Sequence, residues 1–149
     1  MPTIFLDLAG TLVDLTSFEP DSECITCFLT AETAVALKPY PLVLVTGSPR
    51  AQVEKILLSP DMPQYLHFQT IVAAEDGGNQ KSSGAPFLNL IKEYEGPFIH
   101  VGDSDMDEQG ARVANISFVR VSQKGTREEQ RQELTRAISE TIKILSLSE

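Results

Sequence analysis

Short apolar runs alternate with segments of helical periodicity along this chain, and that alternation constrains the fold more than any other feature. The pattern is typical of a parallel sheet that is covered on both faces by helices. Each run is short and rich in β-branched or aromatic residues, which favours strands over buried helices. The five predicted strands are Thr3–Leu6, Leu42–Val45, Gln69–Ala73, Pro97–Val101 and Ile116–Val121. The expected fold class is therefore α/β, a Rossmann-like three-layer sandwich with a central parallel sheet.

Three helices are predicted in the segments that connect these strands. Ser48 is expected to cap the first helix, with Pro49 at its first helical position. A second helix is expected from near Gly84 to Tyr94, and a third, short one over Asp107–Val113.

A long final helix is predicted at the end of the chain. Thr126 and Glu129 have the spacing of a capping box, and an apolar stripe follows them. The stripe consists of Leu134, Ile138, Ile142 and Leu145. Residues 15–30 show no clean period and are expected to be irregular.

The size and charge of the chain narrow the classes of function. Its 149 residues suit one domain, 1–149, with a single core. A net charge of −9 disfavours nucleic acid as a partner. The apolar runs are too short to span a bilayer, and residues 1–15 lack the basic start of a secretory signal, so we expect a cytoplasmic protein. Cys24 and Cys27 have a spacing found in redox and zinc sites, but we interpret them as packing residues, because a structural zinc normally takes four ligands.

Polar residues follow three of the predicted strands. Asp7, Thr46 and Asp103 stand at or just beyond the strand ends, and the carboxyl ends of parallel strands converge on a ligand crevice. Any one of these residues is also explained by the ordinary polarity of turns. Two carboxylates brought together repel each other unless a cation lies between them, and Mg²⁺ prefers such oxygen ligands together with a substrate phosphate.

These residues resemble the motifs of the haloacid dehalogenase-like (HAD-like) hydrolases. The segment 5–12, Phe-Leu-Asp-Leu-Ala-Gly-Thr-Leu, is similar to the first motif, in which a strand precedes Asp-x-Asp-Gly-Thr. Val45-Thr46-Gly47-Ser48 resembles the second motif, Lys81 the third, and the segment 102–107, Gly-Asp-Ser-Asp-Met-Asp, the fourth. The resemblance extends from position 4 to about 119 and keeps the family's order.

The resemblance implies a role for each of these residues. Asp7 would attack phosphorus and form an aspartyl-phosphate. Thr46 and Gly47, together with Lys81, would bind the phosphoryl oxygens. Lys81 taken alone is also explained as a solvated surface lysine.

The resemblance also implies a Mg²⁺ site. Gly10 would let the backbone approach the phosphate, and Thr11 would brace the loop. Asp107 would either orient Lys81 or reach the metal, whereas we interpret Asp105 as a residue that starts a helix. The implied metal ligands are Asp7, the carbonyl oxygen of Ala9, Asp103 and Asp107.

Response-regulator receiver domains are an alternative with similar chemistry, because they also combine a phosphorylated Asp with Mg²⁺, Thr and Lys. Receivers place that Asp after the third strand, where this chain has Ala73-Ala74. The order of the residues therefore favours the HAD-like hydrolases.

Position 9 departs from the family pattern, since Ala9 replaces the Asp that protonates the leaving group and later activates water. A positioned general acid or base typically contributes about 10²–10⁴-fold in rate. Phosphonoacetaldehyde hydrolases also have Ala there, but they rely on a lysine from an inserted cap domain. Only 38 residues separate Asp7 from Thr46 and 34 separate Thr46 from Lys81, so we expect no full cap.

Two functions remain open at the level of sequence. One is a Mg²⁺-dependent hydrolase that acts through Asp7 on good leaving groups, with a phosphorylated small molecule or an exposed phosphoryl group on a larger substrate as its partner. The other is a catalytically inactive HAD-like protein that serves as a metal-binding or protein-interaction module. An open site of this kind is also compatible with a homo-oligomer in which another subunit closes it.

Overall fold

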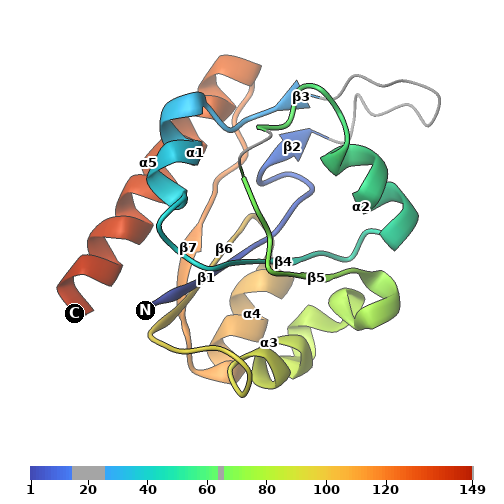
Figure 1. Ribbon diagram of the computed structural model, residues 1–149, viewed down its shortest axis with the longest axis vertical. Helices are drawn as coiled ribbons and strands as arrows, with labels where there is room; N and C mark the ends of the chain where they lie inside the picture. The colour runs from blue at the N-terminus through green and yellow to red at the C-terminus, as the bar shows by residue number, and fades with distance from the viewer. Residues whose placement is uncertain (15–25, 64–65, 149) are drawn as a thin grey trace.

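A computed structural model describes residues 1–14, 26–63 and 66–148, and it shows three layers (Figure 1). The central sheet has five parallel strands in the order β5-β4-β1-β6-β7. These strands are β1 (Thr3–Leu6), β4 (Leu42–Val45), β5 (Thr70–Val72), β6 (Phe98–Gly102) and β7 (Ser117–Arg120). The Rossmann-like α/β fold is confirmed, and each predicted strand overlaps an observed one.

Helices cover the sheet on both faces. The helices are α1 (Ala31–Leu37), α2 (Arg50–Leu57), α3 (Ala85–Leu90), α4 (Asp105–Ala114) and α5 (Arg127–Ser148), with two 3₁₀ segments η1 (Ala74–Asp76) and η2 (Gly78–Ser83). One apolar cluster joins the sheet to α1, α2 and α5, and a second joins the opposite face to α3 and α4. Alternate residues of β1 divide between them, since Ile4 and Leu6 enter the first cluster and Phe5 the second. No helix in the described ranges is long and apolar enough to cross a membrane.

The final helix matches the prediction closely. Thr126 Oγ1 accepts a hydrogen bond from the Glu129 backbone N–H at 3.0 Å, which is the capping contact expected from the sequence. The apolar stripe faces the core: Leu134, Ile138 and Leu145 are buried, and Ile142 is partly buried. This stripe holds α5 against the sheet.

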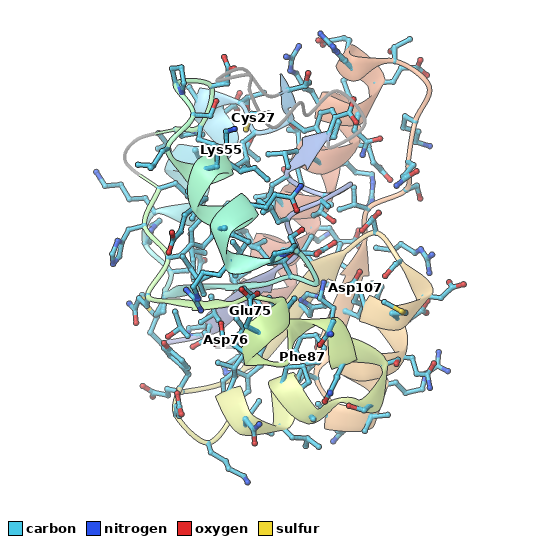
Figure 2. All side chains as sticks on the ribbon, turned by 90° about the vertical axis from the view of Figure 1, so that its right-hand side faces the viewer. Cys27, Lys55, Glu75, Asp76, Phe87 and Asp107 are labelled. Carbon is cyan, nitrogen blue, oxygen red and sulfur yellow. The ribbon has the colours of Figure 1, made fainter. Side chains whose placement is uncertain are left out.

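The first connecting helix begins differently from the prediction. The cap position is Pro49, not Ser48, and no side chain caps the helix there. The Arg50 N–H instead donates to Glu75 Oε1 at 2.9 Å, and the Arg50 guanidinium pairs with Asp76. Glu75 and Asp76 belong to η1, next to the start of α2 (Figure 2). A carboxylate distant in sequence therefore satisfies the helix end that Ser48 was expected to satisfy.

Two further helix boundaries differ from the prediction. Regular helix ends at Leu90, and the segment up to Tyr94 continues as turns. The helix predicted over Asp107–Val113 begins earlier, at Asp105, because Ser104 caps it and Asp107 completes the capping box. The interpretation of Asp105 as a helix-start residue is confirmed.

The predicted irregular segment 15–30 is partly wrong. Residues 15–25, including Cys24, lie outside the described residues. Thr26–Cys27 forms β3, which pairs antiparallel with β2 (Val13–Asp14), and Thr30 caps α1, a helix absent from the prediction. Strands of two residues are too short to show a period. Cys27 is a buried free thiol of the core, as its packing interpretation requires.

Candidate active site

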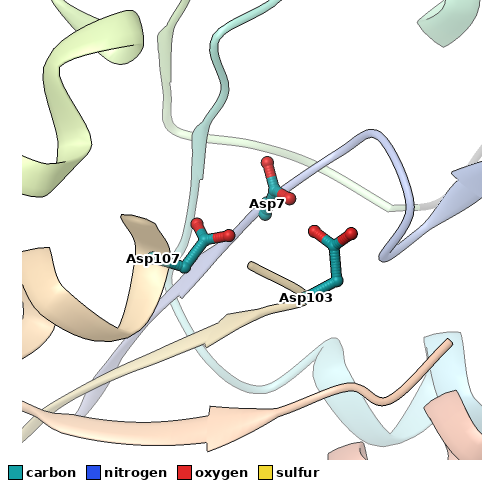
Figure 3. Close-up of side chains that lie close together, drawn as sticks. All are labelled: Asp7, Asp103 and Asp107. Atoms are coloured by element: carbon teal, nitrogen blue, oxygen red, sulfur yellow. The ribbon is translucent and has the colours of Figure 1, made fainter. Parts of the chain in front are cut away.

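Three carboxylates meet at the carboxyl ends of β1 and β6. Asp7 follows β1, Asp103 follows β6, and Asp107 lies in the first turn of α4. One oxygen from each lies within 4.8 Å of the others, and the three groups face a common space (Figure 3). The convergence of strand ends predicted for Asp7 and Asp103 is therefore present, and the capping box of α4 adds Asp107.

Lys81 enters this cluster from η2. Its ammonium lies 2.6 Å from Asp7 Oδ1 and 2.9 Å from Asp107 Oδ1, and the residue is only 4% exposed. The alternative of a solvated surface lysine is therefore wrong. A buried ammonium between two carboxylates is a fixed positive charge next to Asp7.

His100 lies beneath the cluster on β6 and is fully buried. Its Nδ1 is 3.1 Å from the carbonyl oxygen of Phe5, and its Nε2 is 2.7 Å from Asp107 Oδ1. Because a carbonyl oxygen only accepts, Nδ1 donates its hydrogen to Phe5, and Nε2 faces the Asp107 carboxylate. The Phe87 ring packs on the imidazole with centroids 4.6 Å apart. His100 thus holds Asp107 from below.

Burial and charge shift the pKa values of the cluster in opposite directions. Burial raises the pKa of Asp7 to about 8, although the Lys81 charge acts the other way. Burial would lower the pKa of Lys81, but the charges of Asp7 and Asp107 outweigh it and raise the pKa. Lys81 therefore remains an ammonium at neutral pH.

Asp107 is the ionised anchor of the cluster. Burial acts to raise its pKa, but the hydrogen bond from His100 and the charges of His100 and Lys81 more than offset this, so the pKa is lowered. The other oxygen, Oδ2, accepts from the Ser104 backbone N–H at 3.2 Å and hydroxyl at 2.6 Å. With both oxygens already bonded, Asp107 fits the orientation of Lys81 better than direct metal binding.

Asp103 occupies the more open side of the cluster. Thr11 donates its hydroxyl to Asp103 Oδ1 at 3.3 Å or to Asp7 Oδ2 at 3.2 Å, and so links β1 to β6. Gln123, from the loop between β7 and α5, donates to Asp103 Oδ2 at 2.9 Å. The bracing role of Thr11 stays a prediction, and these two contacts are the ones through which Thr11 would exert it.

The remaining predicted residues surround the carboxylates less directly. Thr46 directly follows β4 and is 1% exposed, and its hydroxyl accepts from the Ser48 N–H at 3.1 Å. Gly47 beside it is exposed. Gly10 has φ +78°, and a Cβ there would lie 2.3 Å from Asp103 Oδ2, so both its conformation and its surroundings require glycine. Within the part of the chain that the structure describes, no hydrogen bond joins Thr46 to Asp7, although β4 and β1 are neighbours.

Close backbone packing positions the segment that carries Lys81. A Cβ on Gly110 of α4 would lie 2.0 Å from the Lys81 carbonyl oxygen, and one on Gly78 of η2 would lie 1.9 Å from the Thr46 carbonyl oxygen. Two glycines therefore let η2 lie directly against α4 and against the end of β4. This packing brings Lys81 to Asp7 across 74 positions of sequence.

The profile of the family described as haloacid dehalogenase-like hydrolase matches residues 31–121, which is more than half of the chain. This chain belongs to that family. The match contains Thr46, Lys81, Asp103 and Asp107 and begins after Asp7, whose place in the cluster comes from the structure. No curated protein matches this sequence at a significant level.

Solved HAD-like structures share the fold at low sequence identity. A Thermotoga maritima protein assigned as a β-phosphoglucomutase is 15% identical, with a TM-score of 0.70 over 97% of this chain and 100% of its own. A subfamily IA HAD hydrolase from Geobacter sulfurreducens is 17% identical, with a TM-score of 0.62 over 80% of this chain and 89% of its own. The 3-deoxy-D-manno-octulosonate 8-phosphate phosphatase from Moraxella catarrhalis, solved with magnesium, phosphate and its sugar, is 13% identical, with a TM-score of 0.52 over 100% of this chain and 94% of its own.

The donor set of this HAD-like site fits Mg²⁺. Asp7 and Asp103 offer hard, anionic oxygens, and the cluster lies at a crevice where waters and a phosphate can complete the coordination. Among the described residues, a hydroxyl and an amide hold the Asp103 carboxylate, so one of its oxygens can turn to a cation without breaking an ion pair there.

The sequence did not point to two residues of the site. His100 lies in an apolar run, where it is explained as one residue of a buried strand. Its contact with Asp107 depends on how β6 packs against α4. Gln123 lies 20 positions beyond Asp103 in a polar loop. The only signal for His100 was a titratable residue at a core position, which normally has a hydrogen-bonding partner.

Proposed function

We propose that this protein is a Mg²⁺-dependent phosphohydrolase that forms an aspartyl-phosphate at Asp7 and is restricted to good leaving groups. The observation that carries the proposal is the buried Lys81 ammonium, 2.6 Å from Asp7 and 2.9 Å from Asp107. A module that only bound proteins would gain nothing from an ammonium buried between two carboxylates, because such groups are costly to desolvate.

The first step forms the phosphoenzyme. An Asp7 oxygen bonds to phosphorus while the bond from phosphorus to the leaving-group oxygen breaks, and the electron pair of that bond leaves with the oxygen. Lys81 and the Thr46 hydroxyl are suited to hold the phosphoryl oxygens during this transfer. When bound, Mg²⁺ would neutralise part of the charge on Asp7, Asp103 and the phosphoryl group, which also favours the ionised form of Asp7.

Residue 9 can transfer no proton in either step, the formation or the hydrolysis of the aspartyl-phosphate. Ala9 cannot protonate the departing oxygen, so that oxygen must be stable as an anion, as in acyl and aryl phosphates. Ala9 also cannot activate the water that hydrolyses the aspartyl-phosphate. The second step is therefore expected to be slow, and one equivalent of leaving group should appear in a burst before steady turnover.

The proposal is tested with acetyl phosphate and a series of aryl phosphates of increasing leaving-group pKa, with and without Mg²⁺. Wild type should show Mg²⁺-dependent turnover that falls steeply along the series, and Asp7→Asn should abolish both burst and turnover. Ala9→Asp should flatten the dependence and raise the rate on poor leaving groups by about 10²-fold or more. Ala51→Asp, which adds the same charge on the exposed face of α2, is the matched control and should change nothing.

Two results would contradict the proposal. Turnover that survives Asp7→Asn would exclude the aspartyl-phosphate. Absence of Mg²⁺-dependent turnover in wild type and in Ala9→Asp alike would favour the second candidate, a non-catalytic HAD-like module, which the missing acid at Ala9 supports.

A further inference from the structure

A pocket of about 480 Å³ opens beside the carboxylate cluster, on the side of Ala9 and Asp103. Its opposite wall is the loop between β7 and α5 together with the first turn of α5, and Phe28 contributes an aromatic surface. Pockets of about 300–1,000 Å³ are the usual size for small-molecule ligands. The volume therefore suits a ligand of metabolite size that is continuous with the proposed phosphoryl site.

The outer wall of this pocket presents two cationic side chains, although the protein carries −9 overall and the first turn of α5 also contains Glu128 and Glu129. Lys124 and Arg127 both line it, and within the described residues neither has an acidic group within 4.0 Å. The α5 amino terminus adds its partial positive charge at the same place. Asp14 and Asp103 are the acidic residues of the lining, and Asp103 faces the proposed cation.

The wall is held in place by hydrogen bonds. The Ser122 N–H donates to Glu133 Oε2 at 2.7 Å, and the Lys124 N–H donates to Gln130 Oε1 at 2.7 Å. Gln123, between them, reaches Asp103. The backbone that presents Lys124 is therefore fixed relative to the carboxylate cluster before any ligand binds.

We propose that this pocket is the leaving-group subsite and that it takes a leaving group with an apolar or aromatic body and an anionic end. This inference rests on the proposed function, because the group displaced by Asp7 must depart on the side where Ala9 replaces the acid. The body would lie against Phe28, and the anionic end would pair with Lys124 and Arg127. These cations would also favour departure of the leaving group as an anion, which partly compensates for the missing proton donor.

Binding of non-hydrolysable phosphonates tests the subsite without any need for turnover. Titration calorimetry with Mg²⁺ would compare benzylphosphonate with 4-carboxybenzylphosphonate. The carboxylated ligand should bind wild type about fivefold more tightly, as expected for two solvent-accessible ion pairs, and this advantage should shrink in high salt. The double variant Lys124→Gln/Arg127→Gln should bind both ligands equally.

The matched control is Lys38→Gln/Lys92→Gln, which removes the same charge at two exposed positions outside the pocket and should keep the fivefold advantage. Equal affinity of wild type for the two phosphonates, an advantage that persists in Lys124→Gln/Arg127→Gln, or binding of neither ligand would overturn the subsite. Acetyl phosphate has no anionic group besides its phosphoryl group, so its turnover reports on the proposed function separately. Turnover without discrimination retains the hydrolase and rejects the subsite. Discrimination without turnover rejects the hydrolase, and with it the leaving-group role, and leaves the pocket only as a binding site for carboxylated phosphonates.

Discussion

The floor and the outer wall of the site are built in different ways. The floor consists of Lys81, Asp107 and His100, all buried, with Lys81 and His100 both hydrogen-bonded to Asp107. The outer wall consists of Gln123, Lys124 and Arg127, all exposed and held mainly through the loop backbone. A buried, fully bonded floor fixes charges where a phosphoryl group would lie, whereas an exposed wall can accept leaving groups of different shape. The difference suggests that charge placement is preset and that leaving-group selection is adjustable.

The largest expected effect comes from removing the central cation of the floor. Lys81→Met leaves Asp7 and Asp107 buried without their shared partner, and breaking such a pair costs about 3–5 kcal/mol. Urea unfolding should show that loss, and kcat with acetyl phosphate should fall by about 10²–10³-fold even in saturating Mg²⁺. Lys92→Met, at an exposed position, is the control and should leave both unchanged. An unchanged unfolding midpoint in Lys81→Met would show that the floor is not a paired cluster in solution.

A pair of glycine substitutions compares the two regions directly. Gly110→Ala places a Cβ 2.0 Å from the Lys81 carbonyl oxygen, and such overpacking typically costs about 1–3 kcal/mol. At Gly125, in the outer wall, the nearest atom to a new Cβ is 3.7 Å away, so Gly125→Ala should be close to neutral. Thermal unfolding measures the stability of the two variants, and kcat measures their activity. Similar stability of the two variants would mean that η2 can shift away from α4 without cost.

Substitution of Glu133 should weaken the outer wall without affecting the floor, because Glu133 accepts a hydrogen bond from the Ser122 N–H of the loop between β7 and α5. Burial acts to raise its pKa, but the hydrogen bonds from Arg136 and the Ser122 N–H outweigh it, so the pKa is lowered. A carboxyl group whose pKa is lowered in the folded state stabilises the fold above its ordinary pKa. This stabilisation is lost as the pH falls through the lowered pKa of the folded state. Glu133→Gln should therefore cost about 1 kcal/mol at pH 7, and the difference from wild type should shrink as the pH falls below the ordinary pKa of Glu and vanish below the lowered pKa of the folded state. Chemical denaturation at several pH values measures this, and a difference that does not depend on pH would contradict the assignment.

The smallest effect is expected at Gln123. Its hydrogen bond to Asp103 lies at the exposed edge of the cluster, where a neutral contact contributes about 1 kcal/mol or less. Gln123→Ala should change the apparent Mg²⁺ affinity by only a few-fold and leave stability almost unchanged. Gln123→Glu, which places a like charge next to Asp103, should instead strengthen Mg²⁺ binding, because the cation relieves the repulsion between the two carboxylates. Calorimetry with Mg²⁺ alone separates these results, and a large loss of stability in Gln123→Ala would place the residue with the floor instead.

The sequence by itself determined the parallel sheet, the long final helix, and the meeting of Asp7 with Asp103. These features follow from local signals, since strand and helix periods are visible along the chain and strand ends in such a sheet must converge. The start of α2, the β2–β3 pair, and the contacts of His100 and Gln123 were decided only by the tertiary structure. Glu75, and not Ser48, accepts the hydrogen bond at the start of α2. Gly110 lets the segment that carries Lys81 pack closely against α4. Both contacts arise because segments distant in sequence pack against each other. Such contacts depend on how whole elements approach, and that information is not present in any local stretch of residues.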